Sequence, residues 1–118
     1  MKIKVAAISN RDHNVKTTNK VIRNTLKYQL SMAEADDGAD KTVPEKLHMS
    51  LDAVNNTEQY IINTLGLNKA EQEKLDEKTF NETLAIANYV VLRVQGLSDE
   101  DIDMAKKKSQ AADKSQEA

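Results

Sequence analysis

The spacing of apolar residues changes after the first sixteen residues of the chain. Between Lys2 and Ala7 charged and apolar side chains alternate, which is typical of a half-buried strand. From Thr18 onward apolar residues recur every three or four positions, which predicts helices. We therefore expect a mainly α fold: a small helical bundle of about four to five helices, with a short N-terminal strand-like arm and a disordered C-terminal tail.

The same pattern divides the chain into three parts. We expect residues 1–16 to form an extended arm, residues 17–108 the helical domain and residues 109–118 a disordered tail, because the last part has no core periodicity. A lone strand needs a partner, which is either another short stretch of this chain or a neighbouring subunit. In the second case, Ile3 and Val5 are the candidate residues for self-association.

Two long helices are expected in the first half of the helical domain. The first begins at Thr18 and ends near Ala35, and the second begins around Pro44 and ends before Gly66. The second helix is either continuous or broken at residues 55–57. The expected core-facing residues are Val21, Ile22, Leu26, Leu30 and Ala33 in the first helix, and Leu47, Leu51, Val54, Ile61, Ile62 and Leu65 in the second.

Capping signals predict three further helices. Asn68 with Glu71, and Thr79 with Glu82, have the spacing of capping boxes, and Ser98 is placed to begin the last helix. The helix that follows Asn68 contains few apolar residues, so we do not expect it to be deeply buried. The helix that follows Thr79 is the most apolar segment and is expected to be central.

This central helix is apolar on two sides. A second stripe, formed by Ala85, Tyr89 and Leu92, lies roughly opposite its main apolar face. Either the chain's own helices or a partner protein must cover this stripe. If a partner covers it, the stripe is a candidate binding surface for a hydrophobic helix, and Met32 and Met49 are candidate adaptable contacts.

Composition and charge exclude most kinds of chemistry. The 118 residues include no cysteine, and 17 Lys and Arg against 19 Asp and Glu give a net charge of −2. Disulfides and cysteine-ligated metals are therefore excluded, and binding to nucleic acid or a membrane surface is disfavoured. The acidic cluster at residues 36–40 lacks the ligand spacing of a calcium loop. Because no catalytic motif is present, we expect no enzyme activity, metal or cofactor, and we favour a protein that binds protein.

Three stretches of the second half carry a family resemblance. They are residues 60–67 (YIINTLGL), residues 86–96 (IANYVVLRVQG) and residues 97–102 (LSDEDI). The segment from Asn56 to Ile102 that contains them resembles the tail assembly chaperones of long-tailed phages that infect Gram-positive bacteria. This family has no catalytic motif to transfer to the present sequence.

The resemblance implies a small, largely helical protein that coats the hydrophobic helices of the tape measure protein and keeps them soluble during tail assembly. It also implies self-association along that client. We accordingly expect the tape measure protein and further copies of the chain as partners, and a location in the host cytoplasm rather than in the mature virion.

The alternative is a small helical DNA-binding regulator or an antitoxin. Such a regulator needs a basic recognition helix. Arg23 and Lys27 on the first helix are the nearest candidates, and they lie in a chain of net negative charge. The charge therefore favours the chaperone.

Overall fold

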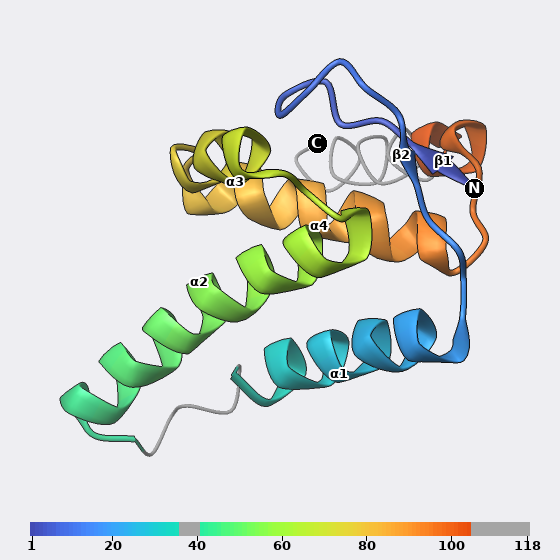
Figure 1. Cartoon of the computed structure of the whole chain (residues 1–118). Coiled ribbons are helices and arrows are strands. Elements are labelled where there is room, and N and C mark those ends of the chain that lie inside the picture. The colour runs from blue at the N-terminus through green and yellow to red at the C-terminus, as the bar shows by residue number, and fades with distance from the viewer. Residues whose placement is uncertain (36–40, 105–118) are drawn as a thin grey trace, which may run out of the picture.

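The computed structural model describes residues 1–35 and 41–104 and is mainly helical (Figure 1). The elements in chain order are β1 (Lys2–Ile3), β2 (His13–Asn14), α1 (Asn19–Ala35), α2 (Val43–Leu65), α3 (Lys69–Asp76) and α4 (Phe80–Val94). Residues 99–104 are also helical. The predicted fold class is confirmed. The acidic cluster at 36–40 and the expected tail at 109–118 lie outside the described residues.

The helix ends follow the capping chemistry of the sequence. Both predicted capping boxes are formed, at the start of α3 and at the start of α4. Ser98 likewise accepts a hydrogen bond from the backbone N–H of Asp101 at 3.2 Å. Gly66 ends α2 in the left-handed conformation, with φ 66°, which favours glycine. The capping signals therefore located these ends correctly.

The helix α2 is continuous through residues 55–57, so the unbroken alternative is correct. Thr57 is buried, and its hydroxyl donates to the carbonyl of Ala53, one turn earlier in the same helix, at 2.7 Å. Asn55 and Asn56 are exposed to solvent. None of the three side chains therefore disrupts the helical hydrogen bonding.

The helices α1 and α2 form an antiparallel hairpin, and α4 packs across one side of it (Figure 1). The N-terminal residues and α3 lie on the other side of α4. One hydrophobic core joins all these elements, and its most buried members include Ile3, Ile61, Leu75 and Val90. The central position expected for α4 is thus confirmed.

The strand β1 finds its partner within the same chain. It pairs antiparallel with β2, with Ile3 opposite His13. Ile3 and Val5 are 0% and 7% exposed, and Ile8 and Val15 are buried beside them. The first sixteen residues therefore contribute apolar side chains to the common core.

Glu71 attaches this N-terminal segment to α3. Its carboxylate accepts hydrogen bonds from Arg11 at 2.7 and 3.1 Å, and lies 2.7 Å from Nε2 of His13. It also accepts from the backbone N–H of Asn68 at 3.0 Å in the capping box. The bonds from Arg11 are the main reason that the pKa of Glu71 falls from 4.5 to about 2. One carboxylate thus caps α3 and holds the N-terminal segment against it.

The expectation that the short third helix is not deeply buried is confirmed, because only Glu71 and Leu75 of its eight residues are buried. Leu75 is 0% exposed and Glu71 only 4% exposed. Leu75 is the apolar anchor that the sequence shows, whereas Glu71 is buried because the N-terminal segment contacts it through Arg11 and His13. An apolar pattern cannot reveal burial that depends on an ion pair.

Replacement of Glu71 with Gln should lower the free energy of unfolding by about 2 kcal/mol at neutral pH, because Arg11 and His13 lose their anionic partner. The depressed pKa means that this stabilisation is present above pH 4.5 and is lost as the pH falls toward about 2. Urea unfolding at pH 7 and at pH 3 should therefore show a smaller difference between wild type and variant at pH 3.

The matched control is Glu73→Gln, on the exposed side of the same helix. It should behave as wild type at both pH values. A Glu71→Gln protein as stable as wild type at pH 7 would contradict the assigned role.

Candidate functional site

The described residues expose an unusually apolar surface on the α1–α2 hairpin. Six large aliphatic side chains, three from each helix, are more than two fifths exposed; they are Ile22, Leu26, Leu30, Val43, Leu47 and Leu51. We call this set the apolar face. A single exposed leucine is ordinary on a protein surface, but six large aliphatic side chains exposed on two neighbouring helices indicate an interaction site.

The α2 part of the apolar face belongs to a stripe that is buried farther along the helix. Leu47, Leu51, Val54, Ile61 and Leu65 lie on one side of α2 at spacings of four, three, seven and four residues. Leu47 and Leu51 are 66% and 57% exposed, whereas Ile61 and Leu65 are 0% and 4% exposed. The stripe is covered where α4 packs on α2, and it is open beyond that contact.

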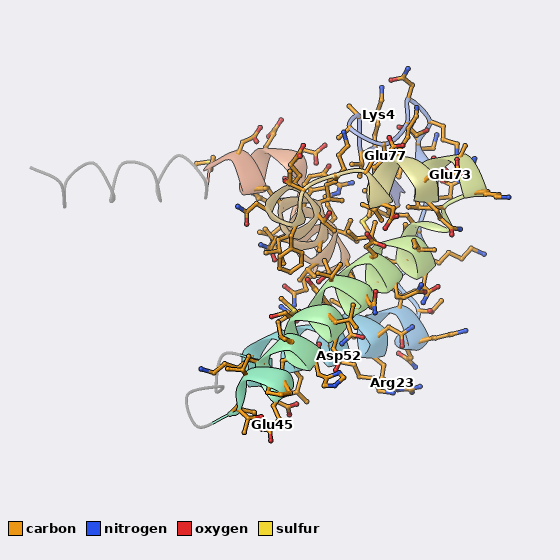
Figure 2. All side chains as sticks on the ribbon, turned by 90° about the vertical axis from the view of Figure 1, so that its left-hand side faces the viewer. Lys4, Arg23, Glu45, Asp52, Glu73 and Glu77 are labelled. Carbon is orange, nitrogen blue, oxygen red and sulfur yellow. The ribbon has the colours of Figure 1, made fainter. Side chains whose placement is uncertain are left out.

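Figure 2 shows this free end of α2. Glu45 and Asp52 mark the first half of the helix, which extends away from the labelled Glu73 of α3, from Glu77 just after α3, and from Lys4. With 23 residues α2 is longer than the 15-residue α4 that crosses it. The first half of α2 therefore extends past the helices that cover its second half.

The α1 part of the apolar face shows the same trend. Ile22 and Leu26 line a cavity of about 240 Å³ together with Val94 and Gln95 from the end of α4. From Ile22 through Leu26 to Leu30 the exposed fraction rises from 41% to 60%. On both helices, exposure increases with distance from α4, so the apolar face is a continuation of the surface on which α4 packs.

The expectation that Ile22, Leu26 and Leu30 face the core was therefore wrong, as it was for Leu47 and Leu51. The residues that α1 buries are instead Thr25 and Tyr28, with Val21 and Met32 partly buried beside them. The apolar pattern selected the wrong side of the helix because the buried side carries hydroxyl groups.

Those hydroxyl groups join α1 to α2. The rings of Tyr28 and Tyr60 stack with centroids 4.7 Å apart. The hydroxyl of Tyr60 bonds to Thr25 at 2.8 Å, and that of Tyr28 bonds to Thr57 at 3.1 Å. We call these four residues the tyrosine seam. Because the seam fills the contact between the helices, the aliphatic side chains lie outside it.

Met32 and Met49 come together in a different place. Both line a cavity of about 280 Å³ between α1 and α2, whose other lining residues are mostly polar; they are Ser31, Glu34, Lys41, Asp52, Ala53 and Asn56. At 100° per residue, these α1 and α2 positions lie on the side of the hairpin opposite the apolar face. The two methionines are partly buried there, and Met32 packs against the core.

The stripe of Ala85, Tyr89 and Leu92 is partly covered by the chain itself. Ala85 is exposed, and Tyr89 and Leu92 are half-buried. The hydroxyl of Tyr89 donates to Asp99, which begins the last helical segment. Burial, followed by this contact with Asp99, raises the pKa of Tyr89 to about 12. A polar contact with Asp99 therefore occupies the Tyr89 part of the stripe.

The remaining sequence candidates occupy separate places. Ile3 and Val5 are buried in the core, and Arg23 and Lys27 are exposed on α1. Within residues 1–35 and 41–104, no three acidic or histidine side chains gather to hold a metal. None of the helices in that part of the chain is long and apolar enough to cross a membrane.

Comparison with known proteins identifies the family. The family model for phage tail assembly chaperone proteins, TAC, matches residues 1–110. The chain belongs to the phage tail assembly chaperone family. The predicted resemblance is confirmed, and the match includes the first half of the chain as well as the second. Neither the curated proteins nor the solved structures that were searched contain a match to the chain.

Membership of this chaperone family gives the protein a role in phage tail assembly. Sequence reasoning predicted a surplus of apolar surface but assigned it to α4 instead of the α1–α2 hairpin. One signal could have located it: the apolar stripe of α2 runs from Leu47 to Leu65, which is farther than the 15-residue α4 extends.

A matched pair of substitutions separates the exposed part of this stripe from the buried part. In this chaperone, Leu51→Ser should change the free energy of unfolding by less than about 0.5 kcal/mol, because the side chain already contacts solvent. Leu65→Ser, on the same helix and stripe, should cost about 3 kcal/mol or more. Urea unfolding measures both, and an equal loss for the two variants would place Leu51 in the core.

Proposed function

We propose that this tail assembly chaperone acts without catalysis by binding hydrophobic helices of the tape measure protein and keeping them soluble until the tail tube assembles around them. The work takes place in the host cytoplasm, and the chaperone leaves before the virion is complete. The observation that carries the proposal is the apolar face on the hairpin of a phage tail assembly chaperone.

The physical basis is the hydrophobic effect. Long apolar helices aggregate in water because their exposed apolar side chains associate with one another. A helix bound in an apolar groove has these side chains covered and does not aggregate. Burial of apolar surface contributes roughly 25 cal/mol per Å², and the entropy lost on association offsets most of this gain, so binding to a face of this size is reversible. Reversible binding suits a chaperone that must release its client.

Several copies on one long client would explain self-association. Chaperones bound to adjacent segments are held at high effective concentration, so even weak contacts between them form. Ile3 and Val5 could take part only if the N-terminal segment opened, because both side chains are buried within the chain. We therefore propose that neighbouring copies of the chaperone contact each other through exposed residues, and not through Ile3 and Val5.

Co-expression tests the proposed function. The tape measure protein of the same phage should be largely insoluble alone and mainly soluble when it is expressed with this chain, and the two should co-purify. An unrelated helical protein of similar size, expressed at the same level, is the control. An unchanged soluble yield, with no co-purification, would contradict the proposal.

A further inference from the structure

The apolar face has room for one more helix beside α4. We propose that a single apolar helix of the client lies diagonally across α1 and α2 next to α4, and contacts Leu26 and Leu30 of α1 toward one end and Leu51 and Leu47 of α2 toward the other. This inference rests on the proposed function and assigns its binding site. It differs from the stripe on α4 and from the methionine cavity.

Continuity with the packing of α4 is the first argument. The side of the hairpin that accepts α4 through Ile61 and Leu65 extends, with the same aliphatic chemistry, to Leu47 and Leu51. A surface that already packs one apolar helix of this chain is suited to a second helix in the neighbouring position. The occupant therefore packs as α4 does.

The dimensions of the apolar face are the second argument. The stretches 22–30 and 43–51 each extend about 12 Å along their helix. The pairings of Thr25 with Tyr60 and of Tyr28 with Thr57 place 22–30 beside 55–63 of α2, so the two apolar stretches follow one another along the hairpin. Leu26 lies beside position 59 of α2 and is therefore about 18 Å from Leu47 along the hairpin; with 8–10 Å between the helix axes, the diagonal is about 20 Å, or roughly 13 residues of the client.

The exposed area favours a single helix over a second copy of the chain. The six side chains of the apolar face expose on the order of 600 Å² together. A stable protein–protein interface buries about 800 Å² on each partner, and obligate dimers bury more. An amphipathic or apolar helix in a groove needs less buried area, because a few of its side chains, at positions i, i+3 or i+4, and i+7, make the main contacts.

The chemistry of the face sets the character of the client segment. All six side chains are aliphatic, so the segment should present Leu, Ile, Val, Ala or Phe toward the hairpin and no charge at the centre of the contact. A buried charge there would have no partner on the face. The client segment is thus an uncharged, apolar helix of roughly 13 residues, or three to four turns.

The test compares two double variants in co-expression with the tape measure protein. Leu26→Ser with Leu47→Ser removes one anchor from each helix of the apolar face. Lys27→Ser with Asp52→Ser is the matched control, since both residues are exposed, one lies on each helix, and the net charge is unchanged. Unfolding curves first establish that both variants fold.

The apolar-face variant should lose affinity for the client by on the order of a hundredfold, seen as lost co-purification and a client that returns to the pellet. The control should retain the client as wild type does. Full client capture by the apolar-face variant would overturn this inference and leave the proposed function standing. Failure of the wild type itself to capture the client would instead refute the proposed function.

Light scattering of the chain without the client tests the second copy as the occupant. Wild type and both variants should have the same molar mass at matched concentration. If the wild type and the control form a larger species that the apolar-face variant cannot form, the face is an interface between copies and the inference is wrong.

Discussion

The tyrosine seam is the interaction on which the rest of the structure depends. Tyr28 and Tyr60 stack between α1 and α2, and each tyrosine hydroxyl reaches a threonine on the opposite helix. The two threonine hydroxyls in turn donate to carbonyls of their own helices at 2.7 and 2.8 Å. Each of the four hydroxyls of the tyrosine seam therefore has a hydrogen-bond partner, and the hairpin is held together without its exposed leucines. That arrangement leaves the aliphatic side chains available for α4 and for a partner.

Glu71 provides a second fixed point at the other side of α4. It holds the N-terminal segment on α3 through Arg11 and His13, so that side of the core is closed by the chain itself. The contrast between the two sides of α4 is informative. One side is completed by residues 1–15 and by the helical segment 99–104, whereas the hairpin extends past α4 with its apolar face exposed. The open side is where a client can bind without unfolding any part of the described structure.

Local signals in the sequence were sufficient for the elements but not for their orientation. Capping pairs such as Thr79 with Glu82, and the glycine after α2, act over a few residues, so they locate helix ends reliably. The buried side of α1 is set by the contact of Thr25 with Tyr60, more than thirty residues away in the sequence. An apolar pattern does not predict this side, because the buried residues carry hydroxyl groups. The same limit hid the burial of Glu71 in α3. A family resemblance pointed to the function, and only the packed structure showed which leucines remain exposed.

The central claim is that the apolar face contacts the client directly. Site-specific photo-crosslinking tests it most directly, with benzoylphenylalanine placed at position 51 on the apolar face or at position 63, an exposed asparagine of α2 on the opposite side of the hairpin. After co-expression with the tape measure protein and irradiation, position 51 should give an adduct with an apolar helical segment of the client, and position 63 should give none. Adducts from position 63 alone, or equal adducts from both positions, would contradict the account.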